Sequence, residues 1–129
     1  MPVAITAFYA SILAGLFLVL SFRVISERRG GRFAYGDNDS PRIHAKIRAQ
    51  ANFVEYAPLG LFLLLLLELQ GLGWFWLHLL ALPFLAGRAI HGYGMSYAPK
   101  ELKWRQGGMV LTTGAMAVMA VFNLFMALF

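Results

Sequence analysis

Apolar residues fill four long segments of the chain, separated by three short polar connections. The segments expected as helices cover residues 2–25, 41–69, 74–92 and 105–128. About 20 helical residues cross the ~30 Å hydrocarbon core of a bilayer, so each segment can form a transmembrane helix. Four spans with short connections require an up-down-up-down arrangement. We therefore expect an all-α membrane protein, a four-transmembrane-helix bundle that forms a single domain over residues 1–129.

Local signals mark the ends of these segments. Ser40 followed by Pro41 is typical of a helix N-cap with proline at the first helical position. Residues 70–73 form a tight uncharged turn, and Trp74 and Trp76 beside it fit an interfacial aromatic belt. The first segment lacks the basic start and the cleavage site of a secretory signal peptide, so we expect it to be retained as a helix.

Composition supports a location in the membrane. Hydrophobic residues make up 60% of the chain and charged residues 13%, whereas soluble domains carry about 25% charged residues. The chain has no cysteine, which excludes disulfides and a cysteine nucleophile, so any thiol must come with a ligand. Its three histidines are scattered, and we expect no metal site. The net charge of +5 lies beside apolar spans, which favours anionic membrane lipid as a partner and not nucleic acid.

A polar stripe interrupts the apolar pattern of the second segment. His44, Arg48, Asn52 and Glu55 are spaced by four, four and three residues, which places them on one helix face with Tyr56 on its flank. An ionisable residue at the centre of a membrane helix costs about 2.5 to 3.5 kcal/mol, so each needs a partner or a use. Arg48 and Glu55 lie two turns apart, and we expect each to have a partner elsewhere. The stripe is either a structural seam between helices or part of a binding site.

A second polar pair, Arg88 and His91, lies on one face of the third segment near the same end of the bundle. Arg88 either pairs with Glu55 or lines a site, and the two roles are compatible. Arg28 and Arg105 stand at helix ends on this side. Other basic residues nearby are expected to extend to lipid headgroups: Arg29, Arg32 and Lys46.

The candidate site residues share a chemistry of several cations, one carboxylate and neutral hydrogen-bonding groups. They are Arg28, Arg48, Asn52, Glu55, Tyr56, Arg88, His91 and Arg105. Such a set suits a small polyanionic ligand that also carries an amine, because arginine binds carboxylates through paired hydrogen bonds and glutamate binds ammonium. A nearby cation also stabilises a ligand thiolate and lowers its pKa from about 8.5.

Three motifs resemble one known family. Residues 48–58, RAQANFVEYAP, resemble the signature R-A-x-x-N-x-x-E-x-x-P of the MAPEG family, the membrane-associated proteins in eicosanoid and glutathione metabolism. The match is closest to the form in cysteinyl-leukotriene synthase. Residues 24–29, VISERR, resemble the end of the first helix of that enzyme, and residues 86–91, AGRAIH, carry the R-x-x-H pattern of prostaglandin-synthesising members. The four-helix plan covers the chain without a further domain, as in the bacterial branch.

This resemblance implies a homotrimer that binds glutathione as a substrate at subunit interfaces near the cytoplasmic surface. The implied glutathione-binding residues are Arg28, Arg48, Gln50, Asn52, Glu55, Tyr56, Arg88 and His91. Gln50 lies opposite the polar stripe, so its inclusion depends on the family match alone. Arg105 resembles the family's catalytic arginine at the start of the fourth helix, which stabilises the thiolate. Met95 stands where the family has a tyrosine.

The implied function is that of a membrane-bound glutathione transferase acting on a lipophilic electrophile, or a peroxidase when that electrophile is a lipid hydroperoxide. We expect it in the bacterial inner membrane. One alternative is a non-catalytic membrane scaffold of the same family that binds a lipid or a partner. Another is a channel or small transporter, which the confinement of polar residues to one end disfavours.

The distribution of basic residues predicts the topology. Lysine and arginine gather in the first and third connections, while the second connection and both ends carry none. By the positive-inside rule, the basic connections face the cytoplasm and both termini face the opposite side. Reporter fusions should place both termini outside the cytoplasm and the connections around Arg32 and Lys100 inside it. A cytoplasmic C-terminus would overturn this topology.

Overall fold

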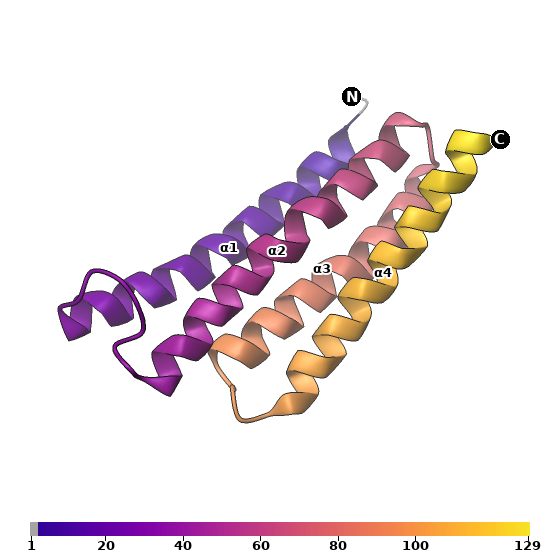
Figure 1. The fold of residues 1–129 in the computed structure, drawn as a ribbon. Coiled ribbons are helices and arrows are strands. Elements are labelled where there is room, and N and C mark those ends of the chain that lie inside the picture. The colour runs from indigo at the N-terminus through magenta and orange to yellow at the C-terminus, as the bar shows by residue number, and fades with distance from the viewer. Residues whose placement is uncertain (1–2) are drawn as a thin grey trace.

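The computed structural model describes residues 3–129, which form four α-helices. They are α1 (Ala4–Gly31), α2 (Pro41–Leu69), α3 (Trp74–Ser96) and α4 (Leu102–Leu128). The helices run alongside one another in alternating directions, so that α1 begins and α4 finishes at the same end of the bundle (Figure 1). The predicted all-α, four-helix up-down bundle is confirmed. The homotrimer stays a prediction.

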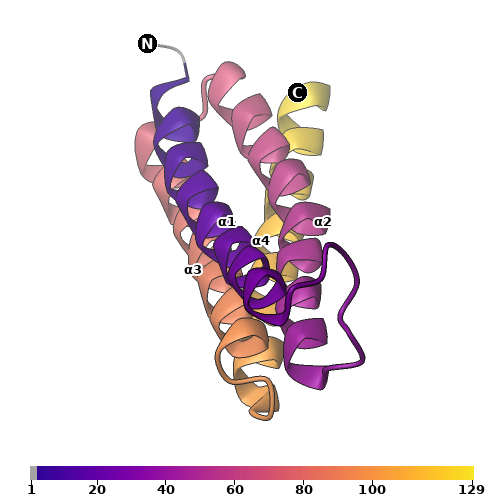
Figure 2. The ribbon, with the colours of Figure 1, turned by 90° about the vertical axis from the view of Figure 1, so that its left-hand side faces the viewer.

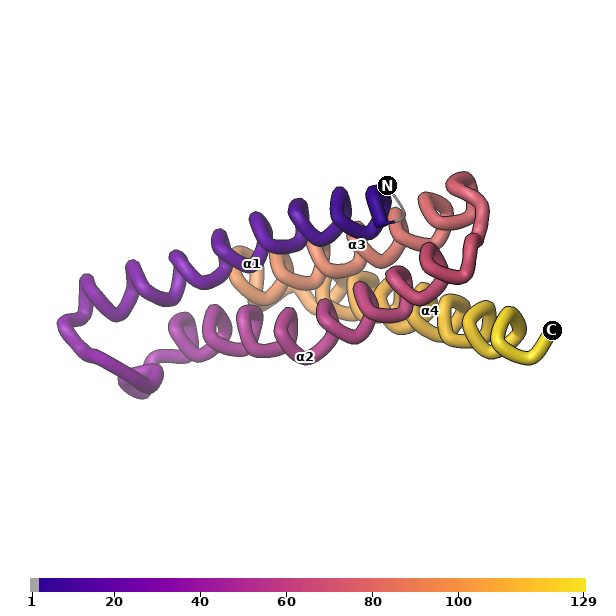
Figure 3. Tube along the Cα trace, turned by 90° about the horizontal axis from the view of Figure 1, so that it is seen from above, coloured from indigo at the N-terminus to yellow at the C-terminus, as the bar shows by residue number. Residues whose placement is uncertain are grey.

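The two central helices, α2 and α3, each contact all three of the others. Over the described part of the chain, α1 and α4 do not contact each other. Figure 2 shows α1 passing in front of α4, with α3 on one side and α2 on the other. The view from above in Figure 3 agrees, because α1 runs along one side of the bundle and α4 along another. A polar residue on α2 or α3 can therefore find a partner on any of the other three helices.

The outer surface of the bundle is that of a membrane protein. The helices α1, α2 and α4 are long and apolar enough to cross a membrane. Large side chains such as Phe8, Phe22, Phe62, Leu82 and Val121 are exposed on it, and apolar surface of this extent needs lipid or protein to cover it. The fourth helix, α3, has 23 residues, a length of about 34 Å at 1.5 Å per residue. Its arginine and histidines lower its hydropathy, and Arg88 is buried within the bundle.

The predicted limits of α2 are confirmed at both ends. Ser40 is the N-cap, its hydroxyl accepts a hydrogen bond from the N–H of Ile43 at 3.5 Å, and Pro41 is the first helical residue. This agreement follows from the chemistry of the first turn, where proline loses no hydrogen bond and serine supplies an acceptor.

The predicted ends of the other helices are wrong by several residues. The first helix continues from the expected residue 25 to Gly31, where Arg32 adopts a left-handed conformation with φ 57°. The third continues from 92 to Ser96, and the fourth begins at Leu102 instead of 105. The apolar pattern marks where side chains meet lipid, whereas backbone hydrogen bonding continues into the polar zone beyond it.

Side-chain contacts fix the end of the bundle that lacks basic residues. The Glu68 carboxylate at the end of α2 accepts hydrogen bonds from the backbone N–H groups of Ile5 and Thr6, at 2.8 and 2.7 Å. These N–H groups belong to the first turn of α1 and have no partner within their own helix. The Tyr9 hydroxyl lies 2.9 Å from Nδ1 of His78. The start of α1 is thus bound to both α2 and α3.

Glycines allow α3 and α4 to approach closely beside the buried Arg88. A Cβ atom at Gly87 would lie 2.7 Å from the backbone nitrogen of Thr112, and one at Gly108 would lie 2.5 Å from that of His91. No ordinary side chain fits at such distances, so glycine is required at both positions. The close approach brings Thr112 within hydrogen-bonding distance of Arg88.

Candidate functional site

Arg88 stands at the centre of a polar cluster that joins three helices. Its side chain is fully enclosed, with 1% of the residue exposed. Nε donates a hydrogen bond to the hydroxyl of Thr112 at 2.9 Å, and Nη1 donates to Oδ1 of Asn52 at 2.7 Å. Nη2 lies 3.3 Å from the sulfur of Met109, and the guanidinium carbon lies 5.0 Å from the centre of the Tyr56 ring.

The Arg88 cation has neutral partners throughout this cluster. No carboxylate among residues 3–129 forms an ion pair with it, so the expected alternative of a pair with Glu55 is wrong. Asn52 takes that place, one turn nearer the start of α2. A buried cation without a counter-ion is costly in a membrane, although hydrogen bonds and an aromatic face offset part of the cost. The cluster is therefore a place where an anionic group would be stabilised.

Arg48 and Glu55 pair with each other on the outer face of α2. Arg48 Nη2 lies 3.6 Å from Glu55 Oε1, and their side chains are 46% and 51% exposed. Our expectation that each has a partner elsewhere is wrong, because the two long side chains together span seven residues, a rise of about 10.5 Å. At 3.6 Å the contact is an ion pair without a hydrogen bond. Both groups can exchange partners readily.

The polar stripe of α2 thus divides into three parts. His44 contacts the first connection, with Nδ1 2.9 Å from Oδ2 of Asp37. The backbone N–H of Asp39 and the His44 ring together hold the pKa of the Asp37 carboxyl below its usual value. The ion pair of Arg48 and Glu55 faces outward, and Asn52 and Tyr56 face Arg88. The inner part is a structural seam between helices, and the outer part remains a candidate for binding.

Four further candidate residues are not bonded to Arg88, although His91 lies one turn from it on α3. Gln50 donates a hydrogen bond to Ser21 Oγ of α1 at 3.0 Å, on the side of α2 opposite the stripe, as predicted. Arg28 donates from Nε to the carbonyl of Gly36 at 3.2 Å. His91 is buried against Gly108, and Arg105 is half-buried at the start of α4. No hydrogen bond or ion pair within the described chain joins these four residues to Arg88.

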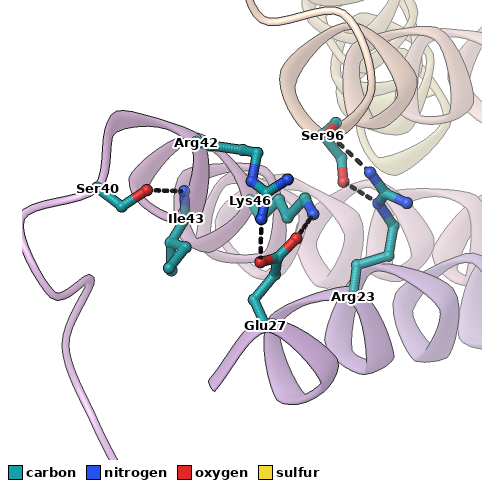
Figure 4. Close-up of polar contacts among 7 residues, drawn as sticks. All are labelled: Arg23, Glu27, Ser40, Arg42, Ile43, Lys46 and Ser96. Atoms are coloured by element: carbon teal, nitrogen blue, oxygen red, sulfur yellow. Dashed lines mark hydrogen bonds and ion pairs between the residues drawn. The ribbon is translucent and has the colours of Figure 1, made fainter. Parts of the chain in front are cut away.

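Lys46 occupies a different environment from the one expected. It was assigned to the lipid headgroups, but only 8% of the residue is exposed and its ammonium group bonds to Glu27 of α1. Arg42 binds the other oxygen of the same carboxylate at 2.7 Å. Figure 4 shows Glu27 between the two cations. The interpretation failed because the partner lies on another helix, 19 residues away.

Two members of the Arg88 cluster, Thr112 and Met109, were not found from the sequence. Thr112 also donates to the carbonyl of Gly108 at 2.8 Å within its own helix. A threonine in an apolar helix can satisfy its hydroxyl in this way without any tertiary partner, so the residue type gives little signal. The available signal was its position one turn after a glycine in a helix with few other polar residues.

An apolar groove of about 400 Å³ lies between α1 and α2 at membrane depth. Its lining includes Phe17 of α1 and Phe53, Val54, Ala57 and Pro58 of α2. Helical spacing puts these α2 residues on the face toward α1, the side on which Gln50 contacts Ser21, and not on the face of the polar stripe. The groove and the polar stripe therefore lie on different sides of α2.

These features define a four-helix integral membrane protein with a polar cluster in its core, and comparison with known proteins agrees. The sequence profile of the MAPEG family matches residues 6–125. The chain is similar to the inner membrane protein YecN of Escherichia coli K12 and to its counterpart in Escherichia coli O6:H1. Each is 35% identical over 120 residues, which cover 93% of this chain and 90% of the relative. The chain belongs to the MAPEG family, which confirms the resemblance and the expected location in the inner membrane.

The hydrogen bond between Arg88 and Thr112 should contribute to stability. Thr112→Val keeps the side-chain shape but leaves the buried Nε–H of Arg88 without an acceptor, which should lower the free energy of unfolding by about 1 to 3 kcal/mol. The matched control is Thr113→Val, because the exposed Thr113 hydroxyl donates only to the Met109 carbonyl of its own helix. Thermal unfolding in detergent measures both. Equal midpoints for the two variants would contradict this role for Arg88.

Proposed function

We propose that the protein is a membrane-bound glutathione transferase that stabilises the glutathione thiolate for attack on a lipophilic electrophile. The MAPEG family includes glutathione transferases. The observation that carries the proposal is the loosely paired Arg48 and Glu55 on an outward face of α2. Asn52, one turn from each of them, binds the buried Arg88, which lacks a carboxylate partner. Asn52 is the signature residue between Arg48 and Glu55, and Tyr56 follows Glu55 directly.

Glutathione matches these groups in charge. It carries two carboxylates, an ammonium group and a thiol. Arg48 can exchange Glu55 for a ligand carboxylate, while Glu55 accepts the ligand ammonium, so both charges stay paired after binding. Neither charge can face lipid unpaired. A neighbouring subunit of the proposed homotrimer would cover this face and supply further contacts from Arg28, Gln50 or His91.

Arg105 is the proposed catalytic residue. It is half-buried at the start of α4, and its guanidinium forms no hydrogen bond to another residue of the described chain. The amino end of α4 adds a partial positive charge beside it. Such a cation lowers the pKa of a bound thiol. The glutathione sulfur then attacks the electrophilic carbon, forms the new carbon–sulfur bond and expels the leaving group. Placement and charge stabilisation lower the barrier, and the protein supplies no nucleophile of its own.

The apolar groove between α1 and α2 suits the second substrate. It is lined by Phe17, Phe53 and Pro58 and lies on the side of α2 that faces α1. A lipophilic electrophile can enter it from the bilayer, and a lipid hydroperoxide in the same position would be reduced instead of conjugated. The alternative, a non-catalytic scaffold, is favoured by the hydrogen bonds that already satisfy Arg88 through Asn52 and Thr112. Turnover with a generic aryl halide separates the two.

Glutathione binding tests the proposed site. Arg48→Ala and Glu55→Ala should each weaken binding ten- to hundredfold, because a charge-assisted hydrogen bond contributes about 1.5 to 3 kcal/mol. Lys103→Ala is the matched control, since Lys103 is also exposed and loosely paired, 3.3 Å from Glu101. Calorimetric titration of the purified protein measures the three affinities. If all three variants bind like the parent, the pocket lies elsewhere; if the parent does not bind, the function is wrong.

Arg105 should act on the thiolate more than on the peptide part of glutathione. Arg105→Ala should raise the thiolate pKa and lower conjugation while most of the binding remains, with each pKa unit equal to about 1.4 kcal/mol. Arg105→Lys keeps the charge with another shape, so partial rescue would indicate electrostatics and no rescue would indicate geometry. The measurements are ultraviolet thiolate absorbance against pH and turnover. An unchanged pKa and turnover in Arg105→Ala would exclude Arg105 from the mechanism.

A further inference from the structure

A second cavity, of about 730 Å³, lies at the end of the bundle that carries the basic connections. Cations come to it from three parts of the chain: Arg23 of α1, Arg42 and Lys46 of α2, and Lys100 of the third connection. The ring of Tyr97 forms part of its wall. None of the residues proposed for glutathione lines this cavity, so it is independent of the proposed active site.

The charge around this cavity is not balanced. Glu27 neutralises one charge of the pair Arg42 and Lys46, because it binds both cations through its two oxygens. Within residues 3–129, neither Arg23 nor Lys100 forms an ion pair. Four cations thus face one carboxylate, which leaves a net charge of +3.

Arg23 is held in a fixed position beside the cavity. Its Nε donates to the hydroxyl of Ser96 at 2.6 Å, and Nη2 donates to the Ser96 carbonyl at 2.9 Å (Figure 4). Its guanidinium lies 3.4 Å from the centre of the Tyr97 ring. These contacts cap the end of α3, but they use two of the five N–H groups that a guanidinium carries. The remaining N–H groups can bind an anion without any loss of side-chain freedom.

The cavity also receives the start of α2. Ser40 and Pro41, the N-cap and the first residue of that helix, belong to its lining. The amino end of a helix carries a partial positive charge that favours an anion. A stable cap for α3 needs Arg23 alone, so capping does not explain why Arg42 and Lys100 meet at the same cavity. A volume of this size exceeds that of a single inorganic anion and falls among those of small-molecule sites.

We propose that this cavity binds the phosphate group of a phosphate ester, with Arg23, Arg42 and Lys100 as its ligands. The phosphate can belong to the headgroup of an anionic phospholipid or to a soluble phosphate ester. Arginine is suited to phosphate because its N–H groups form paired hydrogen bonds with two oxygens. Lys100 adds a charge that can move toward the ligand.

The test is thermal stabilisation of the full-length protein in neutral detergent at constant ionic strength. The probes are short-chain phosphatidylglycerol, glycerol 3-phosphate and, as the zwitterionic control, short-chain phosphatidylcholine. A ligand that binds the folded state raises the unfolding midpoint in a saturable way, which gives its affinity. Lys100→Gln should weaken the affinity for the bound anion about tenfold. Lys103→Gln, three residues later at the start of α4, should leave it unchanged, because the Lys103 partner Glu101 lies outside the cavity lining.

Stabilisation by glycerol 3-phosphate would identify a soluble ester as the source, and stabilisation by phosphatidylglycerol alone would identify the lipid headgroup. Either result supports the site if Lys100→Gln weakens the stabilisation. Arg23→Gln should abolish the stabilisation. If Arg23→Gln does not fold, Lys100→Gln still decides the test. Glutathione affinity should be unchanged in Lys100→Gln. The proposal is overturned if neither anion stabilises the protein, if phosphatidylcholine does so equally, or if Lys100→Gln binds like the parent.

Discussion

The centre of this bundle depends on one buried guanidinium. Arg88 binds Asn52 of α2 and Thr112 of α4 from its position on α3, so three helices share a single charged group. The residue is enclosed by the bundle, with 1% of it exposed, and any rearrangement of these helices would leave a cation without partners. The close approach of α3 and α4 at Gly87 and Gly108 is what brings the threonine within reach. The hydrogen bonding of Arg88 therefore depends on the close packing of α3 against α4.

The number, order and direction of the helices were predictable from the pattern of apolar segments, and α2 was predictable at both ends. Ser40 and Pro41 specify its start through local chemistry that needs no tertiary information. The ends at Gly31 and Ser96 were not predictable in the same way. They lie in polar sequence, where the helix continues because neighbouring elements hold it. Arg23, for example, caps the end of α3 from a helix more than 70 residues earlier in the sequence.

Periodicity predicted which residues of α2 share a face, but it did not predict their partners. Asn52 was correctly grouped with Arg48, yet its amide turns to Arg88 while Arg48 turns outward to Glu55. The partner of Lys46, Glu27, lies on another helix. The partner of each residue depends on which helix is adjacent and on how far its flexible side chain extends. The spacing of residues along one segment gives neither of these two facts. Whether the outward ion pair binds a ligand is likewise decided by what covers α2 from outside.

The contact of Glu68 with the first turn of α1 has a consequence for biogenesis. When α1 leaves the ribosome, the N–H groups of Ile5 and Thr6 have only interfacial water as a partner. Their carboxylate acceptor is made more than 60 residues later, at the far end of α2. The α1–α2 hairpin, and not α1 alone, is thus the first unit of nascent chain in which these two N–H groups have a protein acceptor.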